Sequence, residues 1–331
     1  MPAPATLPPK LRRGDTVRVI APSQSAAIIG EATGRVADRR LAELGLEVTF
    51  GEHVGERDAL GSSSVASRLD DLHAAFADPE VAGVLTVIGG YSSNQLLPRI
   101  DWELIRANPK VFCGYSDITA LHNAMLARAG LVTYSGPHWS TFGMERHFEP
   151  TLRAFEECVF KDGPLDLEPA AEWSDDAWYL DQDNRDLRPN QGWWVLAEGQ
   201  ASGPIVGGNL CTLNLLQGTP LMPSLEGAVL FVEDDFESKP HHFDRNLTSL
   251  LQQRDAAGIA GLAIGRFQKA TGMTRELLEL IVRSKPALAG LPVIANLDFG
   301  HTDPLTTFPI GGTVDLLATT GPGSRVRITR H

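Results

Sequence analysis

A serine at a sharp bend between an expected strand and an expected helix is the residue best placed for chemistry. The apolar run 111–113 (VFC) ends at Gly114, and Ser116 follows two residues later. Beyond it, apolar residues recur at helical spacing until Gly130, which suits a helix C-terminus; they are Ile118, Leu121, Met125 and Ala129. Free backbone N–H groups at such a helix start can stabilise an oxyanion. The pattern is typical of a nucleophile elbow, although Ser116 could instead only cap the helix.

A serine nucleophile needs a base and a carboxylate that orients the base. His301 follows the apolar run 293–297 (VIANL) in a turn rich in glycine and polar residues. Glu233 ends the apolar run 228–232 (AVLFV). Each residue also has a simpler explanation, since His301 could bond to the backbone of its turn and Glu233 could be a solvated carboxylate. Both therefore stay candidates at this point.

Other reactive side chains are weaker candidates. His241 and His242, with Glu237 and Asp244 nearby, lack the spacing of the HExxH and CxxC metal motifs. We therefore expect no metal and no organic cofactor. Cys113 belongs to a strand, where a buried and inert thiol is expected. The cysteines are odd in number and widely spaced, which indicates no disulfide framework.

Composition limits the classes of partner. The chain has 331 residues, 43% of them hydrophobic, and a formal net charge of −12. Binding to a nucleic acid polymer is not expected, because neutralising phosphates requires concentrated positive charge. The first residues lack the apolar core of a signal peptide, and no apolar run approaches membrane-spanning length. We expect a cytoplasmic protein that does not contact a membrane.

The elements that must position these residues alternate between strand and helix in the first half. Strands are expected at residues 17–21, 46–50, 83–88, 111–113 and 131–134, and helices at 29–44, 64–77, 118–129 and 151–160. This alternation predicts an α/β fold with a doubly wound, mainly parallel sheet. The loops at 22–23, 89–94 and 114–117 all follow strands, so they should meet at the carboxyl edge where such folds bind ligands.

The chain is expected to divide into three parts. Residues 1–165 would form the N-terminal α/β domain that carries the elbow. Residues 166–192, acidic and interrupted by proline, would be a connecting active-site loop. Residues 193–331 would form a β-rich mixed α/β domain that carries Glu233 and His301. Its strands are expected at 193–197, 228–232, 261–264, 293–297, 314–318 and 326–328, and its helices at 209–216, 244–256 and 275–284.

Six segments, in order over almost the whole chain, give a family resemblance. They are GDTVRVIAPS, IGGYSSNQLLPRID, VFCGYSDITALH, IVGGNLCTLNLLQGTP, VLFVED and NLDFGHTDPLTTFPIG. Together they resemble the LD-carboxypeptidase family of serine peptidases, which includes the microcin C resistance peptidases. An α/β-hydrolase is not indicated, because Ile118 stands where its elbow has glycine.

The resemblance implies a site and an assembly. It places a Ser–Glu–His triad at Ser116, Glu233 and His301. It also implies an oxyanion hole made by backbone N–H groups around Gly90 and Asp117. The site would lie at the junction of two domains, and the protein would be a homodimer.

Two substrate classes occur within the resembling family. LD-carboxypeptidases release a terminal D-amino acid from murein tetrapeptides, whereas the microcin resistance branch cleaves the amide that joins a peptide or amino acid to a modified nucleotide. Trp173 and Trp178 lie in the acidic connection, and an aromatic side chain there can stack on a nucleobase. We favour Trp178 for this role and the nucleotide conjugate as substrate.

Other possibilities stay open. Further candidates for substrate binding are Tyr91, Ser92 and Asn209, which lie in the matching segments. The murein tetrapeptide is the alternative small-peptide substrate. A non-catalytic ligand-binding protein on a doubly wound fold is the alternative from another class.

Overall fold

A six-stranded sheet organises the first half of the chain. The structure is a computed structural model that describes residues 5–331. The sheet order is β14-β5-β4-β3-β1-β2, and all pairs are parallel except β14 with β5. The strands are β1 (Thr16–Ile20), β2 (Glu47–Phe50), β3 (Val81–Thr86), β4 (Val111–Gly114), β5 (Thr133–Ser135) and β14 (Phe308–Ile310). The helices of this half are α1 (Glu31–Glu43), α2 (Val65–Ala77), α3 (Trp102–Ala107), α4 (Thr119–Ala129) and α5 (Glu149–Val159).

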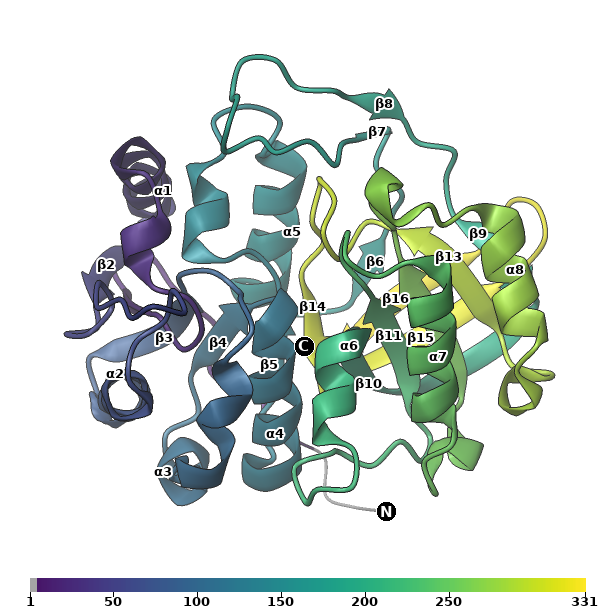
Figure 1. Ribbon diagram of the computed structural model, residues 1–331, viewed down its shortest axis with the longest axis horizontal. Helices are drawn as coiled ribbons and strands as arrows, with labels where there is room; N and C mark the ends of the chain where they lie inside the picture. The colour runs from purple at the N-terminus through teal and green to yellow at the C-terminus, as the bar shows by residue number, and fades with distance from the viewer. Residues whose placement is uncertain (1–4) are drawn as a thin grey trace.

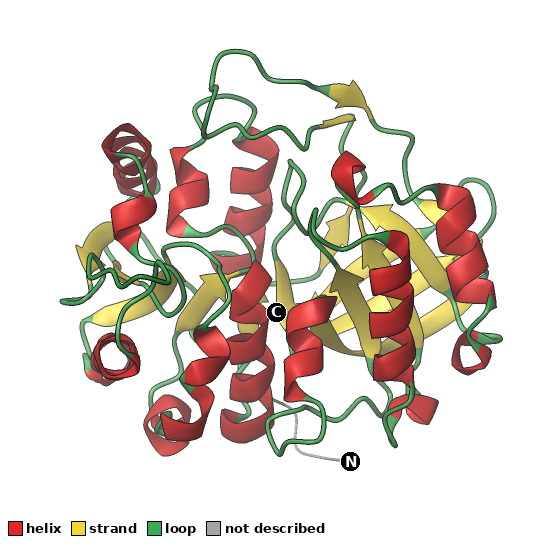
Figure 2. Ribbon diagram, viewed as in Figure 1, coloured by secondary structure: helices red, strands yellow, loops and turns green. Residues whose placement is uncertain are grey.

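A second, eight-stranded sheet lies beside the first (Figure 1). Its order is β6-β16-β15-β10-β11-β12-β13-β9, with the parallel strands β10 to β13 in the centre and antiparallel strands on both sides. The strands are β6 (Leu165–Leu167), β9 (Trp194–Ala197), β10 (Gly199–Asn209), β11 (Val229–Glu233), β12 (Gly261–Gly265), β13 (Val293–Leu297), β15 (Thr313–Ala318) and β16 (Arg325–Arg330). Helices α6 (Leu210–Leu213), α7 (Pro240–Leu251) and α8 (Arg275–Arg283) accompany it (Figure 2).

The predicted fold class is confirmed: a mainly parallel sheet is followed by a mixed, β-rich part. The chain crosses between the parts twice more than expected, because β14 returns to the first sheet and pairs with β5 before β15 and β16 rejoin the second sheet. A short hairpin of β7 (Glu172–Trp173) and β8 (Arg188–Pro189) lies in the connecting region. The boundaries at residues 165 and 192 stay a prediction.

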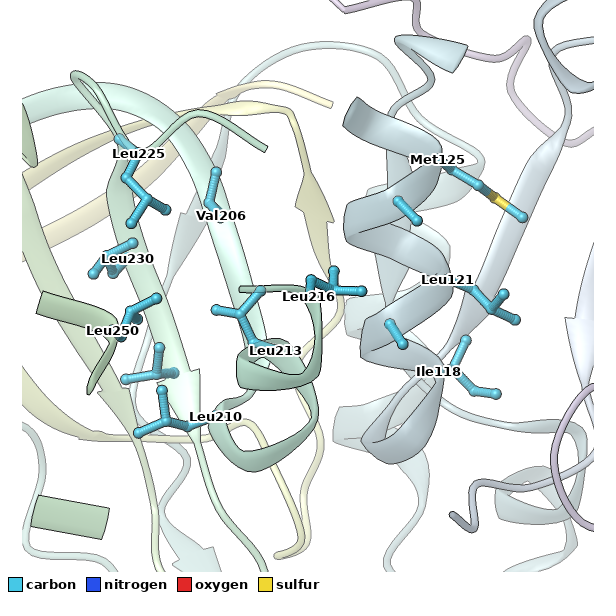
Figure 3. Packing of buried hydrophobic residues seen from close by; sticks show 14 of the residues in the cluster. Ile118, Leu121, Met125, Val206, Leu210, Leu213, Leu216, Leu225, Leu230 and Leu250 are labelled. Atoms are coloured by element: carbon cyan, nitrogen blue, oxygen red, sulfur yellow. The ribbon is translucent and has the colours of Figure 1, made fainter. Parts of the chain in front are cut away.

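One buried apolar cluster joins the two sheets. Helix α4, which follows Ser116, packs against α6 of the second half. Figure 3 shows Leu216 reaching toward α4, while Leu121 points to the other side of that helix. Burying one such leucine side chain contributes about 1.5–3 kcal/mol. This shared core therefore fixes the helix behind Ser116 relative to the strands of the second sheet.

Candidate active site

The backbone at Ser116 has the conformation of a strained elbow. Its φ is +62°, in the left-handed region that residues with a side chain rarely adopt. Strand β4 ends two residues earlier at Gly114, and a short 3-10 turn (Ser116–Ile118) leads into α4. Strain of this kind persists where the surrounding structure holds it, and it clusters at functional sites. A simple cap is a poor explanation, since no side-chain cap bond is found at the N-terminus of α4.

The structure brings Ser116, His301 and Glu233 together. His301 Nε2 lies 3.0 Å from Ser116 Oγ, and His301 Nδ1 lies 2.7 Å from Glu233 Oε2. The side chains of His301 and Glu233 are 16% and 4% exposed. If Nδ1–H donates to the carboxylate, Nε2 is left to accept the serine proton. The arrangement can activate a serine for attack on a carbonyl carbon.

Neighbouring strands and one glycine create this contact. Glu233 is the last residue of β11, and His301 follows β13, two strands further along the same parallel set. Their carboxyl ends therefore lie at one edge of the second sheet. Gly300 has φ +106°, and a Cβ there would lie 2.7 Å from Glu233 Oε2. Glycine is needed at this position for the histidine turn to approach the carboxylate.

Burial and the nearby carboxylate have opposite effects on His301. Burial acts to lower the pKa of His301, but the charge and hydrogen bond of Glu233 more than offset it, so the pKa is raised above its ordinary value. The neighbouring Asp234 is buried, and burial together with the charge of Glu233 raises the pKa of Asp234 to about 7. Two carboxyl groups therefore lie close to His301, in a site that is largely shielded from water.

The raised pKa of His301 gives a pH prediction. Only neutral imidazole accepts the serine proton, so kcat/KM should fall as pH drops through this raised pKa. The change Glu233→Gln removes the stabilising charge and should move the acidic limb to lower pH while reducing the maximum rate. Rates measured from pH 5 to 9 for both proteins check this. An acidic limb that stays in place would contradict the pairing.

The space beside Ser116 Oγ is kept open by Gly89. A Cβ at this position would lie 3.0 Å from Ser116 Oγ and 3.5 Å from the backbone nitrogen of Asp117. That nitrogen is one predicted donor of the oxyanion hole. The other predicted donor is the backbone N–H of Gly90, the residue after Gly89. At Gly90 the φ is +146°, and a Cβ there would lie 2.5 Å from Ser23 Oγ. The oxyanion hole stays a prediction, with its backbone close to the serine.

A methyl group at residue 89 should therefore block the reaction. We expect Gly89→Ala to reduce kcat about 100- to 1,000-fold, the cost of losing one oxyanion donor. The backbone at Gly89 needs no left-handed conformation, but the added Cβ would lie 2.9 Å from Ser116 Cβ, so we expect a moderate loss of stability beside the loss of activity. Initial rates and thermal unfolding, compared with Gly55→Ala at a site with open space, measure the two effects. Near-normal activity would contradict substrate entry on this side.

The carboxylate of Asp117 has a structural role that the sequence did not indicate. It is buried and accepts hydrogen bonds from Ser23 Oγ (2.6 Å) and the Ser93 backbone nitrogen (2.8 Å). Ser93 Oγ in turn donates to the Asp117 carbonyl (2.7 Å). These bonds tie the loops after β1 and β3 to the elbow. The position of Ser23, in a loop directly after the first expected strand, was the only hint in the sequence that this loop lies near the elbow.

The ring of Tyr115 contacts both the catalytic candidate His301 and a second histidine, His138. The ring of Tyr115 lies 4.3 Å from that of His138 and 5.3 Å from that of His301, measured between centroids. Burial lowers the pKa of His138 well below its ordinary value, so this ring stays neutral. Neither residue was predicted to belong to the site: Tyr115 lies in the elbow segment next to Ser116, but no pattern indicated its contact with a histidine, and only folding brings residue 138 beside the elbow.

The predicted substrate-binding residues lie in different settings. Tyr91 is 70% exposed, and its hydroxyl donates to Glu237 Oε1 (3.1 Å) across the two halves. Ser92 is held by Arg68, whose Nη1 donates to its hydroxyl and its carbonyl. Asn209 is buried and caps α6 by accepting from the Thr212 backbone nitrogen (3.0 Å). Substrate binding by Tyr91, Ser92 and Asn209 stays a prediction.

The two tryptophans of the connection differ. The ring of Trp173 lies over the Arg266 guanidinium, 5.1 Å from centroid to carbon. That cation–π contact accounts for an aromatic residue in an acidic segment. Trp178 is half-buried beside the apolar cluster of the first sheet, and its ring meets that of the exposed Tyr179. Stacking of Trp178 on a base stays a prediction.

Three of the remaining expectations can be compared with the structure. Cys113 is buried, and burial raises the pKa of its thiol. Within residues 5–331, no three His, Cys, Asp or Glu side chains are grouped so that they could hold a metal ion. None of the helices in the described part of the chain combines the length and apolar character needed to cross a membrane.

Comparison with known proteins decides the family. Residues 17–136 match the profile of the LD-carboxypeptidase N-terminal domain, and residues 202–316 match that of the C-terminal domain. The putative carboxypeptidase YocD of Bacillus subtilis is 48% identical over 322 residues, which cover 97% of this chain and 99% of YocD. The chain belongs to the LD-carboxypeptidase family. The predicted family and the predicted enzyme class, a carboxypeptidase, are thereby confirmed.

Other members of the LD-carboxypeptidase family are similar over the whole length. The probable murein peptide carboxypeptidase of B. subtilis is 33% identical, with 92% of this chain and 89% of that protein covered. A crystal structure of an MccF-like protein from Bacillus anthracis superposes with a TM-score of 0.97 at 48% identity, covering 99% and 100% of the two chains. The microcin C7 self-immunity protein MccF, in complex with aspartyl sulfamoyl adenosine, gives 0.89 at 26% identity, covering 98% and 99%.

Proposed function

We propose that this carboxypeptidase is a serine hydrolase that uses Ser116, His301 and Glu233 to cleave an amide bond. The observation that carries the proposal is the continuous contact from Ser116 through His301 to Glu233, at 3.0 and 2.7 Å. The left-handed backbone at Ser116 adds support, because it projects the hydroxyl from a bend.

The proposed reaction has two halves. Ser116 Oγ attacks the carbonyl carbon as His301 Nε2 takes its proton, and backbone N–H groups around Gly90 and Asp117 stabilise the oxyanion. His301 then returns the proton to the leaving amine, which leaves an acyl-serine. A water molecule, deprotonated by His301, hydrolyses that ester. Glu233 orients the imidazole and stabilises its charged form throughout.

For the substrate we propose a peptidyl- or aminoacyl-nucleotide conjugate. The support is the bound aspartyl sulfamoyl adenosine in MccF, together with the similarity to the B. anthracis MccF-like protein over the whole chain. The base would stack on Trp178, which packs against the apolar cluster of the first sheet and is followed in the chain by the exposed Tyr179 and Leu180. The expected homodimer is part of the proposal, and sedimentation equilibrium tests it. The expected cytoplasmic location is tested by cell fractionation.

Removing the proposed stack should affect one substrate class. We expect Trp178→Ala to lower kcat/KM for aminoacyl sulfamoyl-adenosine roughly 5- to 150-fold, the equivalent of about 1–3 kcal/mol per stacked base. Activity on a small peptide without a base should hardly change. Tyr179→Ala, an exposed aromatic next to it, is the matched control. Equal losses on both substrates would assign Trp178 a structural role.

The murein tetrapeptide is the second candidate, favoured by the 33% identity to the probable murein peptide carboxypeptidase. Side-by-side assays with a murein tetrapeptide and an aminoacyl sulfamoyl-adenosine decide between the two. Release of the terminal D-amino acid, with no cleavage of the nucleotide conjugate, would overturn the proposed substrate and retain the proposed chemistry.

A further inference from the structure

The segment between β7 and β8, residues 174–187, bridges the two halves of the molecule; we call it the covering segment. It arches over the top of the molecule in Figure 1. Toward the first half, Gln182 donates to the Gly143 carbonyl (2.9 Å) and accepts from the Glu145 backbone nitrogen (3.0 Å). Toward the second half, Asp175 pairs with Lys269 (2.8 Å). The segment is thus attached to both halves of the molecule.

A buried arginine lies at the base of this segment. The Arg185 side chain is 2% exposed, and each of its three nitrogens has a partner. Nε donates to Asp176 (2.8 Å), Nη2 to Asp303 (3.0 Å), and Nη1 to the carbonyl of Arg146 (3.1 Å). One guanidinium therefore connects the covering segment, the first half and the turn that contains His301.

Asp303 is the link between Arg185 and the histidine. It stands two residues after His301, and its backbone pairs with Ser174 in both directions at 2.8 Å. Burial raises the pKa of Asp303, and the charge of Arg185 counteracts this rise. Without Arg185, a buried carboxylate would lose its cation, which is costly.

We propose that Arg185 is a positioning residue that holds the covering segment in place and, through Asp303, fixes the turn of His301. The inference rests on the proposed function, because it assigns Arg185 an effect on the base of that reaction. It goes beyond the proposed function because Arg185 would link the position of Trp178, which lies in the covering segment, to the position of His301. Lysine can replace Arg185 only in part, since one ammonium keeps the charge but lacks the planar fork that reaches three partners.

Arg188, at the start of β8, provides a matched control. It carries the same charge three residues away, but its side chain is 48% exposed and pairs with Asp186, which is 52% exposed. Exposed pairs of this kind contribute little. A general effect of charge in this region should appear equally in Arg188→Gln and Arg185→Gln.

The first measurement is hydrogen–deuterium exchange of the full-length protein, which needs no substrate. Peptides covering residues 174–187 should exchange at least about tenfold faster in Arg185→Gln than in wild type or Arg188→Gln, because local opening exposes their amides. Arg185→Lys keeps the charge and should give an intermediate value even if the glutamine variant folds poorly. Unchanged exchange in both Arg185 variants would overturn the inference.

The second measurement is the rate at which diisopropyl fluorophosphate labels Ser116. In this reaction the Oγ–phosphorus bond forms, fluoride leaves and His301 takes the serine proton, so the rate depends on the histidine and not on a bound substrate. We expect Arg185→Gln to slow labelling about 10- to 100-fold and Arg188→Gln to change it less than twofold. Equal rates in wild type and Arg185→Gln would overturn the positioning of His301.

A double variant separates positioning from general damage. Asp303→Asn in the Arg185→Gln background removes the uncompensated buried charge, so labelling should recover at least about threefold relative to Arg185→Gln alone. Lack of recovery would overturn the role of Asp303 as the link. If wild type itself is not labelled at Ser116, the proposed function fails, whereas altered labelling confined to the Arg185 variants concerns this inference alone.

Discussion

Replacing Ser116 with alanine is expected to abolish hydrolysis while the fold remains intact. The hydroxyl is the proposed nucleophile, and His301 Nε2 stands 3.0 Å away to take its proton. By comparison with other triads, the rate should fall about 10⁴- to 10⁶-fold. The measurement is the residual rate of the variant on the substrate that the wild type cleaves, with product formation followed by chromatography.

The control for Ser116→Ala addresses folding. Alanine keeps a Cβ in the left-handed conformation, so the backbone cost at this position should be similar in both proteins. Thermal unfolding should therefore change by no more than a few degrees, and Ser67→Ala on α2 should retain full activity. A Ser116→Ala protein that keeps more than about a tenth of the wild-type rate would contradict the assignment.

The second large effect concerns His301 and Glu233 together. We expect His301→Ala to lose about as much activity as Ser116→Ala, on the order of 10⁴- to 10⁶-fold. Glu233→Ala should lose less, because a base that is poorly oriented still exists. The double variant should be little worse than His301→Ala, since both changes disable the same proton transfer. Measured kcat values for the two single variants and the double variant complete the cycle.

A neighbouring carboxylate serves as control for the cycle. Asp235 lies two residues after Glu233, and its carboxylate accepts the backbone N–H of Glu237 (2.9 Å). The charge of Asp235 also raises the pKa of His301, but less than Glu233 does, so Asp235→Asn combined with His301→Ala should show a much weaker coupling than Glu233→Ala. Independent, multiplying losses for Glu233→Ala and His301→Ala would mean that at least one of them acts outside the proposed triad.

Local signals in the sequence were sufficient for the elements that carry the site. The expected helix after Ser116 ends at Gly130, which indeed has a left-handed backbone with φ +66°. Apolar runs predicted β4, β11 and β13 within a residue or so. Short-range periodicity and turn residues depend on neighbours in the chain, so the sequence alone is enough to recognise them.

Strand β10 shows where such patterns fail. It runs for 11 residues, Gly199–Asn209, yet its glycines and proline indicate a loop. In the structure a Cβ at Gly203 or Gly207 would collide with the backbone of the adjacent strand region, at Gly227 and Phe231. The glycines are needed for close approach between strands, which is a tertiary requirement.

The sequence by itself determined the chemistry available: a serine at an elbow, and a carboxylate and a histidine at strand ends. Only the tertiary structure decided the distances, because Ser116 and His301 are 185 positions apart and meet through the packing of two sheets. The same holds for Arg185, whose partner Asp303 lies 118 positions away. No pattern in the sequence distinguishes Arg185 from the other charged residues of the connection. In the structure its side chain is buried, and a buried charge must find a partner.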